Sequence, residues 1–234
     1  LTAFHEAGHA VCTYYMPTQD PVHQVSIIPR GMAGGFTLSL PTQDRSYMTK
    51  TEMVEEIVVL LGGRVAEKLV LNEISTGASN DIERATKIAR NMITRYGFSE
   101  KLGPIVYGQN EEEVFLGRDI SHSRNYSETV AAEIDGEIRE VIDTCYESTR
   151  QVLEDHMDQL HRVAEYLMTY EKVDGEKFKA LMENREVPPS AEDTFVPLSK
   201  LAEQAKGSDE PEQVIGEEPP VEEYPADPSA PDAE

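Results

Sequence analysis

Three residues near the start of the chain have the spacing of a metal-binding pair with a base beside it. His5, Glu6 and His9 form the pattern HExxH. On a helix, residues i and i+4 share a face, so both imidazoles can hold one Zn²⁺. Glu6 follows His5 by about 100° around the helix axis, where its carboxylate reaches a water on the metal without being a ligand. The pattern predicts zinc-assisted attack of water on a carbonyl carbon, with Glu6 as general base.

HExxH also arises by chance, since histidine and glutamate are tolerated on a solvated helix. The other four histidines of the sequence form no i,i+4 pair. The segment around the motif is apolar rather than solvated in character, with a stripe made of Ala3, Phe4, Ala7, Ala10 and Val11. Both observations favour a metal site over a chance match.

A catalytic zinc needs a third protein ligand. Cys12 lies about 10 Å from His5 along a straight helix, so we interpret it as a core residue. Two carboxylates are better candidates. Glu67 lies in an apolar helix, where the alternative is a salt bridge with Arg64, and Asp81 lies in a first helical turn, where the alternative is complementation of the helix dipole. Spacing alone leaves both open.

Apolar periodicity predicts the helices that must position these side chains. Gly62 and Gly63 interrupt the second of them, and because a glycine inside a helix costs about 1 kcal/mol relative to alanine, we expect close packing there. Asn80 and Glu83 have the spacing of a capping box at the start of the third, and Gly97 is a natural stop at its end. The three helices are predicted over residues 1–16, 50–71 and 80–96.

Two strands are predicted between the first and second helices. Residues 22–28 and 35–40 read as an antiparallel hairpin, and Pro41 favours a sheet edge for the second strand. An extended peptide could add to that edge and lay its scissile bond over the zinc. The alternative is that the hairpin is purely structural. The predicted substrate-binding residues are Gly35, Phe36 and Thr37.

The rest of the folded body is predicted to be largely helical. Residues 98–126 lack periodicity and read as a long irregular segment. A long amphipathic helix follows, then a helical stretch from Met157 to Met168 and a short helix at about 174–184. The fold class is therefore mainly α with a small β-hairpin element, over residues 1–184.

Charge separates that body from the end of the chain. The 234 residues include 21 Lys+Arg and 44 Asp+Glu, a formal net charge of −23. Residues 185–234 carry 14 acidic and 3 basic residues and nine of the 14 prolines, which predicts a disordered acidic tail. The negative charge argues against binding to nucleic acid, and the apolar runs are too short to span a bilayer. The two cysteines form no disulfide framework.

Several separated motifs resemble the protease domain of the FtsH family, the membrane-anchored AAA+ zinc metalloproteases. They are HEAGH, GGRxAE (Gly62 to Glu67), STGASNDI (Ser75 to Ile82), Arg95 to Ser99 and Val114 to Gly117. The resemblance covers about residues 1–184. It implies that Asp81 is the third zinc ligand, beside His5 and His9, and that Glu67 orients a ligand or the helix.

The resemblance also implies more than this chain contains. The family carries an N-terminal membrane anchor and an AAA+ module, forms homohexamers and degrades unfolded or membrane proteins. It places the protease domain on the cytoplasmic face of the bacterial inner membrane. No GxxxxGK[ST] motif occurs here, so ATP would act only through a module outside the sequence. Leu1 opens directly into a helix without an initiator methionine or signal peptide, so we expect a piece of a longer protein.

A hypothesis from another class is a helical assembly module with a vestigial or structural metal site. The long helices after residue 127 and the acidic tail would suit protein contacts. A closed structural zinc site needs four protein ligands, and the sequence offers only three convincing ones. The presence of Glu6 also favours catalysis, because a structural site has no use for a base.

Overall fold

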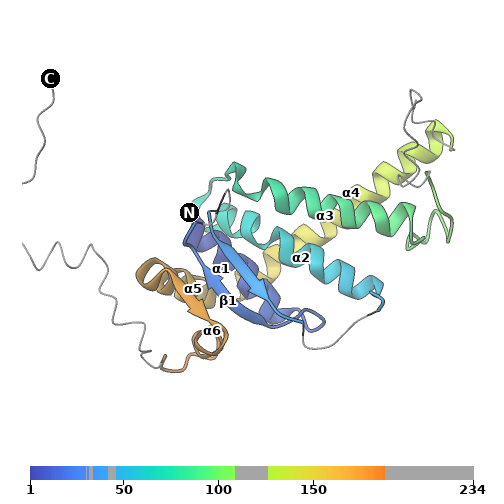
Figure 1. Cartoon of the computed structure of the whole chain (residues 1–234). Coiled ribbons are helices and arrows are strands. Elements are labelled where there is room, and N and C mark those ends of the chain that lie inside the picture. Colours follow the sequence, from blue (N-terminus) through green and yellow to red (C-terminus); the bar gives the residue numbers. More distant parts are fainter. Residues whose placement is uncertain (30, 32–33, 42–45, 109–125, 188–234) are drawn as a thin grey trace, which may run out of the picture. The chain divides into compact units, whose positions relative to one another are not determined.

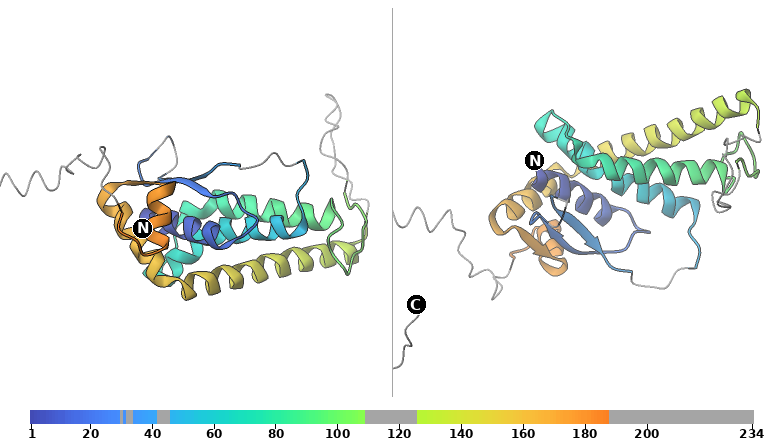
Figure 2. Two further views of the ribbon diagram at one scale, coloured as in Figure 1. Left: turned by 90° about the horizontal axis from the view of Figure 1, so that it is seen from below. Right: turned by 45° about the horizontal axis from the view of Figure 1, so that its top comes forward.

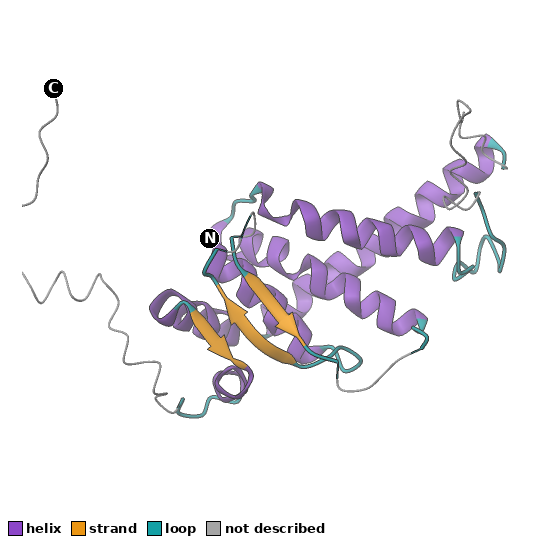
Figure 3. Cartoon of the chain, viewed as in Figure 1, coloured by secondary structure: helices purple, strands orange, loops and turns teal. Residues whose placement is uncertain are grey.

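The predicted mainly helical fold with a small β element is confirmed by a computed structural model (Figures 1 and 3). The structure describes residues 1–29, 31, 34–41, 46–108 and 126–187. The predicted acidic tail therefore lies outside the described residues, apart from 185–187. The elements are α1 (Thr2–Tyr15), β1 (Val22–Ser26), β2 (Phe36–Ser39), α2 (Lys50–Ala66), the π-helical turn η1 (Glu67–Leu71), the 3₁₀ turn η2 (Thr76–Ala78), α3 (Ser79–Thr94), α4 (Glu128–Asp155), α5 (Met157–Tyr170), β3 (Lys172–Asp174) and α6 (Gly175–Met182).

The sheet contains the predicted antiparallel hairpin and one strand that the sequence did not predict. β1 pairs with β2 on one side and with β3 on the other, both antiparallel, in the order β2-β1-β3. β3 has only three residues, of which the middle one, Val173, is buried, and three residues are too few for a period-two pattern to stand out in the sequence. β2 is an edge strand, as Pro41 predicted.

The second predicted helix changes its winding before it ends. α2 begins at a capping box in which the Thr49 hydroxyl accepts from the Glu52 amide and the Glu52 carboxylate accepts from the Thr49 amide. The chain then continues as the π-helical turn η1, which stops at Asn72 with φ at 50°. π-helical turns are rare in proteins, and those that occur are often found at functional sites.

The capping box predicted at Asn80 and Glu83 is wrong. α3 begins at Ser79 without a side-chain cap, because the 3₁₀ turn η2 leads directly into it. That turn is capped instead by the Ser75 hydroxyl, which accepts from the Gly77 amide. α3 ends at Thr94, and Gly97, three residues further on, has the positive φ of 63° that the turn away from the helix requires.

α1 lies at the centre of the described fold. It contacts α2, α4 and α5 and the strands β1 and β2. The predicted close packing at the glycines is confirmed: a Cβ atom on Gly62 would lie 2.7 Å from the Gly8 carbonyl oxygen, so the two helix backbones touch. A Cβ atom on Gly63 would lie 2.5 Å from the His5 ring. Glycine therefore makes room both for the helix crossing and for a histidine of the motif.

The long amphipathic helix predicted after residue 127 forms as α4 and runs along α2 and α3 (Figure 2). α5 and α6 match the two helical stretches predicted beyond it. Of the predicted irregular segment, residues 98–108 contain turns but neither helix nor strand, and 109–125 lie outside the described residues. Across the described part of the chain, no helix is both long and apolar enough to cross a membrane.

Candidate metal centre

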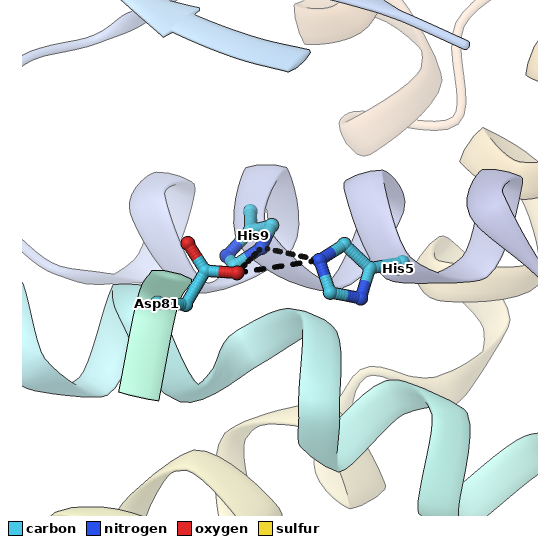
Figure 4. A group of neighbouring side chains, drawn as sticks. All are labelled: His5, His9 and Asp81. Carbon is cyan, nitrogen blue, oxygen red and sulfur yellow. Dashed lines mark hydrogen bonds and ion pairs between the residues drawn. The ribbon is translucent and has the colours of Figure 1, made fainter. Parts of the chain in front are cut away.

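Three side chains bring one ligand atom each to a single point (Figure 4). The Nε2 atoms of His5 and His9 are 3.1 Å apart. One carboxylate oxygen of Asp81, Oδ2, lies 3.5 Å from His5 Nε2 and 3.6 Å from His9 Nε2. Ligands about 2.0–2.1 Å from a tetrahedral zinc are separated from one another by roughly 3.3 Å. The triangle therefore has the size that a zinc ion requires.

Hydrogen bonds on the far side of each ring orient the two imidazoles. His9 Nδ1 donates to the Val59 carbonyl oxygen at 2.8 Å, and His5 Nδ1 donates to Glu67 Oε1 at 2.8 Å. A carbonyl oxygen can only accept, so the His9 proton lies on Nδ1 and leaves the Nε2 lone pair for a metal. A carboxylate acceptor fixes His5 in the same tautomer.

The charges within the cluster stabilise one another. Burial alone raises the pKa of Asp81, but the nearby imidazoles of His5 and His9 outweigh it and hold that pKa well below its usual range. Burial alone lowers the pKa of His5, but hydrogen bonds with Asp81 and Glu67 outweigh it and raise that pKa. Asp81 is therefore ionised, which is the form that binds a cation.

Glu6 is buried at the wall of the same cleft, beside strand β2. The Thr37 hydroxyl donates to Glu6 Oε2 at 2.9 Å. A Cβ atom on Gly35 would lie 2.8 Å from Glu6 Oε1, so the carboxylate rests against bare backbone there. Burial raises the pKa of Glu6, against the lowering effects of His9 and the Thr37 hydrogen bond. A raised pKa suits a carboxylate that must take up a proton near neutral pH.

The structure separates the two carboxylates that the sequence left open. Asp81 reaches the Nε2 atoms, whereas Glu67 reaches the opposite side of the His5 ring. Glu67 is fully buried and accepts two further hydrogen bonds from Ser75. Among the described residues no ion pair joins it to Arg64, whose guanidinium donates to the Ser75 carbonyl oxygen instead. The alternative of an Arg64 salt bridge is therefore wrong.

Cys12 is a core residue, as predicted. Its side chain is fully buried in the apolar cluster and is not part of the group of metal-ligating atoms. Burial raises the pKa of its thiol to about 12. A thiol that holds its proton so strongly is a poor zinc ligand, because zinc binds the thiolate.

The cleft over the metal-ligating atoms is open, with a volume of about 1280 Å³. Gly35, Phe36 and Thr37 of the predicted substrate strand all line it, together with the three ligand residues and Glu6. Sequence reasoning missed two groups that support the site, the Val59 carbonyl oxygen and Ser75. No residue type marks a backbone carbonyl, but Ser75 lies within the STGASNDI motif and could have been found there.

The chain is similar to known proteins over most of its length. A model of peptidase family M41 matches residues 1–181. ATP-dependent zinc metalloprotease FtsH 1 of Thermoanaerobacter sp. (strain X514) is 57% identical over 187 residues, 80% of this chain and 31% of the relative. FtsH of Caldicellulosiruptor bescii is 57% identical over 182 residues, 78% of this chain and 30% of the relative. FtsH of Bacillus subtilis (strain 168) is 47% identical over 189 residues, which is 80% of this chain and 30% of the relative.

The chain thus spans less than a third of the length of these relatives. Since the family model covers most of it, the chain belongs to peptidase family M41 and is a relative of the FtsH zinc metalloproteases.

Proposed function

We propose that residues 1–184 form the zinc endopeptidase domain of a larger ATP-dependent protease, and that this domain hydrolyses peptide bonds of unfolded proteins. The observation that supports this most strongly is a buried carboxylate, Glu6, in one cleft with three converging ligand atoms. The names of the relatives, ATP-dependent zinc metalloproteases, agree with it.

His5, His9 and Asp81 would hold the zinc. Their donor set fits this ion, because two imidazoles with free Nε2 atoms and one carboxylate are typical of catalytic zinc and leave a coordination position open. When bound, zinc supplies Lewis-acid chemistry, which polarises a carbonyl and makes water a stronger acid. Glu67 keeps His5 in the required tautomer through the hydrogen bond to Nδ1.

Glu6 would carry the proton. As general base it takes a proton from the attacking water, and as general acid it then gives that proton to the leaving amine. The Thr37 hydroxyl holds one of its oxygens in place. Glu6 is only 6% exposed, so little bulk water reaches its carboxylate. Burial raises the pKa of a carboxylate toward neutral pH, where it can both accept and release a proton.

The edge strand β2 would bind the peptide. Its outer edge is not paired with any described strand, and its residues line the cleft beside Glu6. An extended substrate could continue the sheet by main-chain hydrogen bonds, which gives weak sequence specificity. Substitution of Thr37 by proline would test this poorly, since it also removes the hydroxyl that contacts Glu6.

We therefore expect a period-two effect in a substrate peptide whose amides are N-methylated one at a time. Amides that face β2 lose a hydrogen bond on methylation, and KM rises by about 3- to 10-fold at those positions. Amides that point away lose none and serve as the matched controls. Steady-state kinetics on the series measures the pattern, and an effect without alternation would exclude strand addition.

The remaining proposals concern the whole protein. ATP would act through an upstream AAA+ module, the assembly would be a homohexamer, and an N-terminal anchor would hold it at the bacterial inner membrane with this domain on the cytoplasmic face. The competing hypothesis, an assembly module with a structural metal, lacks support in the described residues, where only three ligand atoms converge rather than four.

Zinc removal tests the proposed function directly. We expect about one zinc per purified chain and slow hydrolysis of a permanently unfolded protein, with no rapid cleavage of a stably folded one. Dialysis against a zinc chelator should abolish the hydrolysis, and added zinc should restore it. Metal analysis with a fluorescent peptide-release assay measures both. Hydrolysis that survives complete metal removal would contradict the proposal.

A further inference from the structure

Every polar atom of Ser75 makes a hydrogen bond to a residue near the metal centre. Its amide donates to Glu67 Oε2 at 2.8 Å, and its hydroxyl donates to Glu67 Oε1 at 3.0 Å. The hydroxyl also accepts from the Gly77 amide at 3.1 Å. Its carbonyl oxygen accepts from the Arg64 guanidinium at 3.0 Å. This is a complete set of partners for one serine in a short connection between two helical segments.

Those bonds join the two parts of the chain that supply the ligand atoms. On one side, Glu67 Oε1 accepts from both the Ser75 hydroxyl and His5 Nδ1, so Ser75 is two hydrogen bonds away from His5 Nε2. On the other side, the bond from Gly77 closes the 3₁₀ turn η2, which runs without interruption into the first turn of α3, where Asp81 lies. Ser75 thus helps to hold both His5, through Glu67, and Asp81, through η2.

Among the described residues, the Ser75 hydroxyl is the only side-chain donor to Glu67 besides His5. Without it, Glu67 Oε1 keeps only the His5 bond, and the buried carboxylate loses one of its three partners. A fully buried carboxylate that loses a hydrogen bond is destabilised, because no water is there to replace the lost donor. The Gly77 amide loses its cap at the same moment, which loosens the start of α3.

We propose that Ser75 is a positioning residue, which fixes the placement of Asp81 relative to His5 and thereby sets the affinity of the site for zinc. This inference rests on the proposed function, because it requires that the three converging atoms hold zinc. Ser75 itself lines no part of the cleft and is not among the converging ligand residues, so it acts only through Glu67 and η2.

The test measures zinc affinity in Ser75→Ala and in the pair Ser75→Thr and Ser75→Val. Threonine and valine have the same shape and differ in the hydroxyl, so their comparison holds even if the alanine variant does not fold. Ser148→Ala is the matched control, since the Ser148 hydroxyl is exposed on α4 and bonds only its own helix. Competition with a chromogenic chelator gives the zinc dissociation constant, and thermal unfolding of the metal-free forms reports the fold.

We expect zinc to bind about 10- to 100-fold more weakly to Ser75→Ala and Ser75→Val, the range typical for loss of a group that supports a ligand. Ser75→Thr and Ser148→Ala should bind zinc as the unaltered chain does. The metal-free Val variant should unfold about 2–8 °C below the Thr variant, because it lacks the hydrogen bond to Glu67 and the cap of Gly77. A merely structural role of the hydroxyl would lower this Tm but leave the zinc affinity of the still-folded chain unchanged. Equal zinc affinity in the Thr and Val variants would overturn the role of Ser75 alone. Absence of zinc binding in the unaltered chain would overturn the proposed function, and the inference with it.

Discussion

Replacing Glu6 by glutamine is expected to abolish hydrolysis of an unfolded protein while about one zinc per chain stays bound. Glutamine has the same shape and can still accept the hydrogen bond from the Thr37 hydroxyl, so the wall of the cleft is preserved. An amide cannot take up a proton from water. Loss of a general base costs about 10²- to 10⁴-fold in rate, which would bring the slow hydrolysis expected of this domain below detection.

A second buried glutamate provides the control for this substitution. Glu55 on α2 is 8% exposed and accepts from the amide and hydroxyl of Thr18, away from the metal-ligating atoms. Glu55→Gln should retain both zinc and hydrolysis. Metal analysis and a peptide-release assay on the two variants decide the matter. Hydrolysis at the normal rate in Glu6→Gln would remove Glu6 from the mechanism and revive the assembly-module hypothesis.

Replacing Asp81 by alanine is expected to remove zinc and activity together. Two imidazoles alone leave a zinc ion with too few protein ligands, so the metal should be lost on gel filtration. Glu67→Gln should behave differently. It keeps all three converging atoms and weakens their support, because an amide nitrogen replaces one of the two oxygens that accept from His5 and Ser75, which costs about 10- to 100-fold in zinc affinity. Zinc titrations of both variants measure the difference.

Asn80→Ala is the control for the Asp81 variant, because Asn80 is the exposed neighbour that lines the same cleft. It should bind zinc normally. The opposite ranking, with zinc kept by Asp81→Ala and lost by Glu67→Gln, would make Glu67 the ligand. The two substitutions thus decide between the carboxylates that spacing alone could not separate.

What the sequence predicted well depends on neighbours along the chain. The paired histidines, the helices and the hairpin all follow from repeats of three, four or two residues, and these local patterns form as expected. Gly62 and Gly63 carried a further signal, since a glycine pair inside an apolar helix indicates that another backbone approaches. That backbone is Gly8, in the motif helix itself.

What the sequence could not predict depends on contacts between distant segments. Asp81 lies 72 residues beyond His9, and only packing of α3 against α2 decides which carboxylate faces the imidazoles. The contact of Thr37 with Glu6 likewise requires the hairpin to lie over α1. β3 carries too few residues for any pattern, and the cap at Ser75 was missed because the 3₁₀ turn η2 precedes α3 and takes the cap in its place.

The burial of α1 has a consequence for how the site moves. Ten of its fourteen residues are buried, including both histidines and Glu6. We expect backbone amides in such a helix to be among the slowest of the domain to exchange with solvent, because a buried core helix opens only with a large part of the fold. β2 has no fully buried residue and borders the same cleft. We therefore expect any opening that admits a polypeptide to occur at the edge strand β2, while the helix that carries the two imidazoles and the carboxylate keeps its position.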